Sequence, residues 1–320
     1  MKFYYPVLMM LLSICALCSC GAPFELVAGS LDDAQSVDGP ALVSRFDRPL
    51  AMASDSQGNL YITEASGRIR KLSLDGVVST FAGNGQELMA PVPQHALRPL
   101  NSSIEPYGIF IRDDQLYFSG PGCINYIDLR LSEEKQRLET IWGDCLTLQQ
   151  TRDNNQRSSD VNLVINELKE ILVSVDHSSF YAIINQNNSS QIIGHLERES
   201  NVVHVVGDGL NVTGIAMLDN GSLYRTINFG EPFVNPSAGL FSFPFSTDRQ
   251  RLISSDMIGR HPSGLASDGR KGLYYIDLGD RQLKKFQVDS QNVMVLSSDT
   301  HSEMMTKSLH FNVAKQEVFI

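Results

Sequence analysis

The chain has 320 residues, of which 42% are hydrophobic, so it can bury a large core. This composition excludes a disordered or fibrous protein. The formal net charge of −10 argues against a nucleic-acid partner, because phosphate backbones attract basic surfaces.

The first predicted element is a targeting segment. Lys2 gives a short positive region, and residues 7–17 form an apolar run of the length of a secretory signal, too short to span a bilayer well. Residues 17–20 then read Leu-Cys-Ser-Cys. This pattern resembles the lipobox of bacterial lipoproteins, in which the final cysteine is acylated and becomes the new N-terminus. The resemblance implies lipidation at Cys20, with ordinary signal cleavage nearby as the alternative.

The expected domain boundaries follow from this resemblance. Residues 1–19 are predicted to be the signal peptide, 20–23 a lipidated tether and 24–320 a single domain. Gly21, rather than Asp, follows the cysteine, which resembles the pattern of lipoproteins sent to the outer membrane. We therefore expect N-terminal acyl chains to anchor the protein to a bacterial membrane of the cell envelope, at the outer membrane.

A repeat begins beyond the tether. Four short strands are predicted over residues 49–53, 60–64, 68–72 and 77–83, with turn signals at 55–59 and 75–76. Four antiparallel strands joined by tight turns make one propeller blade. An apolar–Tyr pair opens the second strand of every unit, at positions 60–61, 116–117, 180–181, 223–224 and 273–274. Glycines 108, 214 and 264 fall in first strands, where backbones are expected to crowd around the central channel.

The segment from Pro49 to Gly85 resembles an NHL repeat, in its Gly-Asn-Leu-Tyr turn and its Arg-Ile-Arg-Lys third strand. Residues 24–29 are predicted to be a lone fourth strand, whereas 308–314 and 317–320 are predicted to be first and second strands. The expected fold is therefore all-β: a six-bladed β-propeller of NHL-like repeats, whose N- and C-terminal strands share the closing blade. Residues 146–169 fit no blade and are predicted to be an insertion: a long loop with a short helix or an added strand, either functional or a solvated spacer.

Two cysteines remain after Cys20. Cys123 begins a predicted third strand and Cys145 ends the fourth strand of the same unit. Pairing Leu129 with Glu139 would place the two cysteines opposite each other, at a spacing that suits a disulfide. We predict this bridge, with two free buried thiols as the alternative.

Polar side chains follow several of the second strands. The resemblance to six-bladed lactonase-like propellers implies that Glu64, Asn228 and Asp277 could hold Ca²⁺ or another divalent cation through oxygen ligands. The alternative is that these side chains bond turn amides and that the protein has no cofactor. No hydrolase elbow, phosphate loop or zinc-protease motif occurs, so no catalytic residue is predicted.

Two connections are candidates for ligand binding. Phe229 and Phe233 lie in or beside a Pro-rich loop, and His95 lies in another long connection. Exposed aromatic side chains favour peptide or glycan binding. The sequence thus predicts a membrane-anchored extracytoplasmic propeller that recognises an envelope protein, peptide or glycan, with no nucleic-acid partner. The alternatives are a divalent-metal-dependent lactonase, hydrolase or lyase-like enzyme, and a structural part of an envelope assembly.

Overall fold

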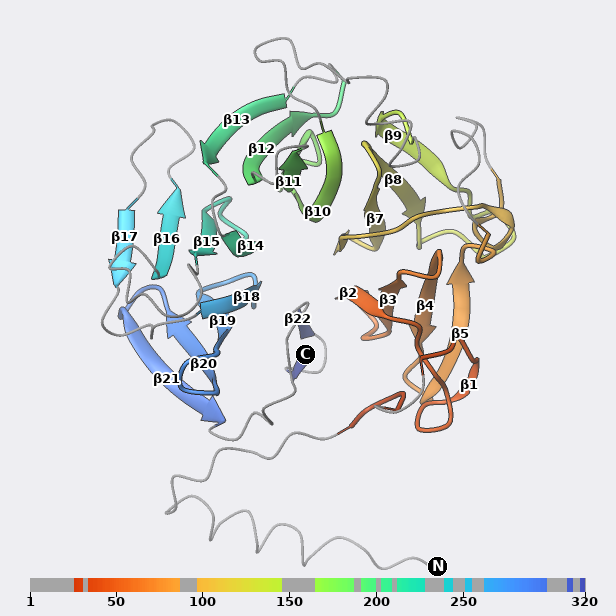
Figure 1. Ribbon diagram of the computed structural model, residues 1–320, viewed down its shortest axis with the longest axis horizontal. Coiled ribbons are helices and arrows are strands. Elements are labelled where there is room, and N and C mark those ends of the chain that lie inside the picture. The colour runs from red at the N-terminus through yellow and green to blue at the C-terminus, as the bar shows by residue number, and fades with distance from the viewer. Residues whose placement is uncertain are drawn as a thin grey trace, which may run out of the picture.

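The computed structural model describes residues 26–319 except 31–33, 87–96, 146–164, 187–190, 200–202, 209–211, 228–238, 244–250, 255–261, 298–309 and 313–316. These residues form antiparallel sheets arranged as blades around a ring (Figure 1). Within this part of the chain no α-helix is present, and no helix could cross a bilayer.

Each blade has four strands that run outward in sequence order. Blade one has β2 (Pro49–Ser54), β3 (Leu60–Glu64), β4 (Arg68–Leu72) and β5 (Val77–Ala82), with β1 (Gly39–Pro40) added outside β5. Blade two has β6 (Ile109–Arg112), β7 (Gln115–Gly120), β8 (Cys123–Asp128) and β9 (Glu139–Gly143), preceded by the 3₁₀ turn η1 (Pro99–Asn101). Blade three has β10 (Ile165–Val173), β11 (Ser179–Gln186), β12 (Gln191–Glu197) and β13 (Val203–Asp208). Blade four has β14 (Val212–Met217), β15 (Leu223–Ile227), β16 (Gly239–Phe243) and β17 (Arg251–Ser254). Blade five has β18 (Pro262–Ser267), β19 (Gly272–Asp277), β20 (Gln282–Gln287) and β21 (Asn292–Ser297).

The second strands explain the repeated apolar–Tyr pairs. All residues of β3, β15 and β19 are buried, because a strand inside a blade has neighbouring blades against both faces. An apolar residue followed by Tyr therefore buries one side chain on each face of the sheet. The predicted positions of these second strands are confirmed in all five blades.

Glycine lets the inner strands of adjacent blades touch through their backbones. A Cβ atom at Gly108 would lie 2.4 Å from the carbonyl oxygen of Lys169, and one at Gly214 would lie 2.5 Å from the amide nitrogen of Leu265. The first contact joins blades two and three, and the second joins blades four and five. The expectation that these glycines relieve crowding is confirmed.

At one end of the ring, the turns between first and second strands fasten neighbouring blades. Ser56 Oγ donates to Asp114 Oδ2 at 2.6 Å, which links blade one to blade two. His177 Nε2 lies 2.9 Å from Asp113 Oδ2, which links blade two to blade three. A backbone hydrogen bond joins the corresponding turns of blades four and five.

Among the described residues the ring has five complete blades, and the expectation of six was wrong. The two strands β22 (His310–Asn312) and β23 (Glu317–Phe319) form a separate two-stranded sheet, and β22 contacts β2 and β18 (Figure 1). His310 Nε2 lies 2.8 Å from Ser54 Oγ, which fastens β22 to blade one. The two C-terminal strands were thus predicted in the right places.

The predicted N-terminal strand over residues 24–29 was wrong for the part that is described. Residues 26–30 form no strand, and the amide of Gly29 donates to the carbonyl of Ala41 at 2.9 Å. Ala28 packs against the outer core of blade one, around Leu72 and Val78. Ala28 therefore packs against a finished blade, and this segment does not complete the closing one.

The segment predicted to be an insertion also differs from expectation. β10 begins at Ile165, so residues 165–169 belong to the innermost strand of blade three. The rest of that segment, 146–164, lies outside the described residues.

Candidate functional site at the ends of the second strands

Glu64 is the last residue of β3, and its side chain is completely buried. Its Oε1 accepts from Arg70 Nη1 at 2.9 Å and from the backbone amide of Asp47 at 3.1 Å. Its Oε2 accepts from Ser36 Oγ at 2.6 Å and from Ser66 Oγ at 2.9 Å. Both carboxylate oxygens are therefore fully engaged by groups of the protein itself.

Arg70, on β4, neutralises this carboxylate. Its guanidinium is completely buried, donates to the carbonyl of Arg45 at 3.0 Å and pairs with the carboxylate of Asp38. A buried arginine with a carboxylate on two sides is held by several charge-assisted hydrogen bonds. A cation that bound Glu64 would have to displace the guanidinium.

Asp277, the last residue of β19, has the same arrangement in blade five. Its buried carboxylate accepts from Lys284 Nζ at 2.6 Å and from the amide of Gly279 at 3.0 Å. Lys284 also pairs with Asp280 at 2.8 Å. Desolvation lowers the pKa of Lys284, but the hydrogen bonds to the two aspartates outweigh it and leave the pKa above its usual value. The ammonium group stays charged and holds Asp277.

The two ion pairs share one geometry. Arg70 is paired in the sheet with Ile62, two residues before Glu64, and Lys284 is paired with Tyr275, two residues before Asp277. Each cation therefore reaches its carboxylate along the diagonal between neighbouring strands, a distance that long side chains span. The pairing recurs at one position of the repeat, in the first and the last complete blades.

Blade four does not continue this pattern at the equivalent position. Glu64 is paired with Pro49 and Asp277 with Pro262, at the start of the inner strand, and the matching residue of blade four is Ile227, paired with Val212. Asn228, the third predicted ligand, follows one residue later and lies outside the described residues.

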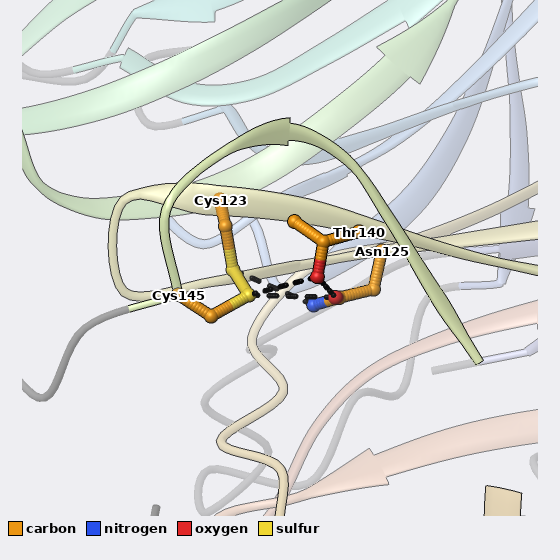
Figure 2. The surroundings of a disulfide bond; sticks show 4 residues. All are labelled: Cys123, Asn125, Thr140 and Cys145. Atoms are coloured by element: carbon orange, nitrogen blue, oxygen red, sulfur yellow. Dashed lines mark hydrogen bonds between the residues drawn. A yellow bond between two sulfur atoms is a disulfide. The ribbon is translucent and has the colours of Figure 1, made fainter. Parts of the chain in front are cut away.

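Blade two carries a disulfide in the same region (Figure 2). Cys123 and Cys145 are joined, with Cα atoms 4.9 Å apart, and both side chains are buried. Thr140 Oγ1 donates to Asn125 Oδ1 at 2.9 Å beside the bridge. Gly120, at the end of β7, leaves room here, because a Cβ atom would lie 3.2 Å from Cys123 Sγ. Cys123, Cys145, Asn125 and Gly120 line a narrow hollow together with residues 104, 105 and 121.

The strand register that suggested this bridge was wrong. Glu139 pairs with Tyr126 rather than Leu129, and Cys123 pairs with Gly143. Gly143 has a φ of +68°, a conformation that glycine adopts readily. The chain bends there, past the end of β9, and this brings Cys145 back to Cys123.

Replacing both cysteines, Cys123→Ser with Cys145→Ser, is expected to lower the free energy of unfolding by about 2–4 kcal/mol, as for other disulfides that close short loops. The bridge encloses a loop with a sequence separation of 22 residues. Urea unfolding of the oxidised wild type, the reduced wild type and the double variant measures the difference. Equal stability of all three would contradict the expectation.

Glu170 is a second unusual carboxyl group, on the innermost strand of blade three. Its Oε2 accepts from the amide of Ile215 at 3.2 Å, across the boundary to blade four. Burial raises the pKa of Glu170 to about 8, and this single hydrogen bond offsets the effect only in part. The carboxyl group is therefore mainly protonated at neutral pH.

The raised pKa of Glu170 makes stability fall as pH rises. Between the ordinary pKa of 4.5 and about 8, the unfolded chain has lost the Glu170 proton whereas the folded protein keeps it. Glu170→Gln is therefore expected to match the wild type at about pH 4, below the ordinary pKa, and to be more stable by a few kcal/mol at about pH 9. Each tenfold difference in proton affinity between the folded and unfolded states corresponds to about 1.4 kcal/mol. Urea unfolding at both pH values checks this, and a wild-type-to-variant difference that does not change with pH would contradict it.

Several predicted site residues lie outside the described residues: Cys20, His95, Asn228, Phe229 and Phe233. Among the residues that are described, no group of three or more His, Cys, Asp or Glu side chains is placed to hold a metal ion. The residues that sequence reasoning missed are Arg70 and Lys284. The sequence feature that could have identified them is a basic residue two positions after the residue directly opposite each carboxylate, which is Arg68 for Glu64 and Gln282 for Asp277.

No protein-family model and no curated protein matches the chain. Solved structures resemble it at low identity. A structural-genomics protein of unknown function from Bacteroides thetaiotaomicron is 10% identical, with a TM-score of 0.58 over 90% of this chain and 70% of that one. A gluconolactonase from Xanthomonas campestris is 15% identical, with a TM-score of 0.54 over 89% of this chain and 83% of that one. Hydrazine synthase from Kuenenia stuttgartiensis is 12% identical, with a TM-score of 0.53 over 87% and 84%. At these identities the likeness shows the β-propeller fold alone.

Proposed function

We propose that this chain is a lipid-anchored propeller of NHL-like repeats, in the bacterial cell envelope, that recognises a protein, peptide or glycan through its connecting loops or channel mouth. The observation that carries this proposal is the buried pairing of Glu64 with Arg70 and of Asp277 with Lys284. These carboxylates are the described members of the set that a lactonase-like propeller would use for a cation.

A cation at Glu64 would compete with the hydrogen bonds that the carboxylate already accepts. Ca²⁺ takes six to eight oxygen ligands and favours carboxylates that are free to turn toward it. At Glu64 every oxygen already accepts two hydrogen bonds, and the basic partner is buried with it. Displacing Arg70 from Glu64 would leave a buried guanidinium without its carboxylate partner, which costs several kcal/mol. Structural ion pairs explain these residues with no metal.

The second candidate function is a divalent-metal-dependent hydrolase acting on lactones or related esters. It is favoured by the fold shared with the gluconolactonase and by the position of two acidic side chains at equivalent strand ends. This function requires a metal ion that binds Glu64 and Asp277 tightly enough to displace Arg70 and Lys284. It also requires a third ligand from blade four.

Metal content and melting of the mature protein separate the two candidates. We expect no stoichiometric Ca²⁺, Mg²⁺, Mn²⁺ or Zn²⁺ after dialysis, no rise in melting temperature on adding them, and no hydrolysis of gluconolactone. The matched variants are Glu64→Gln and Asp277→Asn, which keep the shape but lose the charge. A bound ion that raises the melting temperature and is lost in these variants would favour the hydrolase.

The anchor has its own test. Mass spectrometry of the N-terminal peptide from membranes should find acylated Cys20, and Cys20→Ala should release the protein into the soluble fraction. An unmodified N-terminus in the membrane fraction would contradict the lipoprotein proposal.

A further inference from the structure

An apolar patch lies at the outer edge of blade one. It consists of Leu42 and Val43 in a turn after β1, Leu74 and Val77 around the β4–β5 turn, and Leu26 and Val27 near the start of the described chain. Their exposed fractions run from 43% for Val27 to 63% for Leu42. Single exposed apolar residues are ordinary, but a contiguous group on a soluble domain marks a surface that meets a partner.

Backbone hydrogen bonds hold the three segments of the patch together. The amide of Gly29 donates to the carbonyl of Ala41 at 2.9 Å, and the amide of Ala41 donates to the carbonyl of Gly76 at 2.8 Å. β1 pairs with β5 at Pro40 and Val77. Residues 26–29, 39–44 and 73–77 therefore lie side by side in a fixed arrangement at the outer edge of blade one.

The position of the patch in the sequence points to its partner. Leu26 stands only six residues after Cys20, and six residues reach at most about 20 Å even when fully extended. If Cys20 carries acyl chains in a bilayer, Leu26 and the patch around it must lie within that distance of the membrane. No other blade is tied to the anchor by so short a segment of chain.

We propose that this apolar patch of blade one docks onto the lipid bilayer that holds the acyl chains. The inference rests on the proposed lipidation of Cys20. One or two acyl chains give only limited membrane affinity. A second apolar contact close to the anchor increases this affinity, because the short linker keeps the patch at a high effective concentration near the bilayer. The bilayer face of the protein is then the outer edge of blade one.

The contact is apolar rather than electrostatic. Among the described residues beside the patch, Asp38 and Asp75 are exposed and acidic, and Arg45 is partly exposed, with its Nη1 donating to the carbonyl of Val43 at 2.8 Å. These charges are of both signs and form no basic surface that would attract anionic headgroups. Binding should therefore persist at high salt, in contrast to the binding of a basic surface.

The experiment uses the full mature lipoprotein in vesicles of phosphatidylethanolamine and phosphatidylglycerol. An environment-sensitive fluorophore is attached at Leu74→Cys, and the matched control is Met294→Cys, an equally exposed residue on the outer strand of blade five. A quencher carried by the lipid should quench the Leu74 probe severalfold more strongly than the Met294 probe, and aqueous iodide should show the reverse order. The difference should persist in high salt.

A second set of variants tests the contribution of the patch itself. Leu42→Asp with Leu74→Asp should increase severalfold the rate at which the lipoprotein transfers between vesicles, whereas Val295→Asp on blade five should not. All of these side chains are exposed, so circular dichroism melting should be close to that of the wild type in each variant.

The outcomes separate this inference from the proposed function. Acylated Cys20 with equal quenching of the two probes would overturn the docking but leave the anchored propeller. A Cys20 without acyl chains would overturn both. Shielding of the Leu74 probe without vesicles, together with a dimer in sedimentation, would show that a second copy of the chain covers the patch and would overturn the membrane contact.

Discussion

Arg70→Met is expected to lower the free energy of unfolding by about 3–5 kcal/mol, the cost of leaving a buried charge without its partner. Glu64 and Arg70 are both completely buried, so the variant leaves the Glu64 carboxylate in the protein interior without its cationic partner. The double variant Glu64→Gln with Arg70→Met removes both charges and should recover most of that loss. Urea unfolding of the two single variants and the double variant completes the thermodynamic cycle.

The control is an ion pair of the same kind on the surface. Arg130 pairs with Asp128 at 2.7 Å, but its side chain is 53% exposed. Arg130→Met should therefore cost no more than about 1 kcal/mol. If Arg70→Met proves as mild as Arg130→Met, the pair in blade one is not a structural element, and the case against a cation at Glu64 weakens with it.

The second large effect concerns the packing of blade against blade. Gly108→Ala would place a Cβ atom 2.4 Å from the carbonyl oxygen of Lys169 and 2.9 Å from the Cα atom of Glu170. Both are backbone atoms of the neighbouring inner strand, so relief requires blades two and three to move apart. We expect a loss of about 3 kcal/mol or more, at the upper end for overpacked cores.

Gly194→Ala is the matched control, because it makes the same change inside blade three. There the new methyl group would meet Cδ1 of Ile184 at 2.5 Å and Cγ1 of Val203 at 3.1 Å. These are side-chain atoms that can rotate away, so the expected cost is about 1 kcal/mol. Thermal and urea unfolding of the two variants compare them. Equal losses would mean that the backbone contact between blades is not rigid.

Much of the fold could be predicted because every blade repeats one local pattern. A strand buried on both faces selects an apolar residue and a tyrosine side by side, as at Leu60 and Tyr61. Tight turns with glycine then set the strand ends. These signals act over a few residues, which is why the second strands of all five blades were placed correctly from sequence.

The closure of the ring depends on long-range packing and was predicted only in part. The residues around Ala28 are apolar enough for a strand, yet Ala28 packs on the outside of a blade that already has all its strands, and Leu26 and Val27 are exposed. Apolar content alone does not show whether a segment pairs as a strand or which surface it contacts. The C-terminal strands were placed correctly from their own strand-forming residues.

The candidate site shows the same limit at the level of side chains. The position of Glu64 and Asp277 at the ends of second strands was predictable from spacing. Their partners were not, because the residues directly opposite them are Arg68 and Gln282, and the cations reach in from the next pleat. A bridge between Cys123 and Cys145 was expected from a register that was itself wrong, since the glycine bend after β9 cannot be read from strand pairing alone.

The hydrogen bonds between turns of adjacent blades limit where insertions can be accepted during evolution. Because strands alternate in direction, the turns that hold Asp113 and Asp114 occupy one end of the ring, and the connections between blades leave from the other end. An insertion among the fastened turns would break a link between neighbours. An insertion at the opposite end leaves those links intact, so new recognition loops can be acquired there while the ring stays closed.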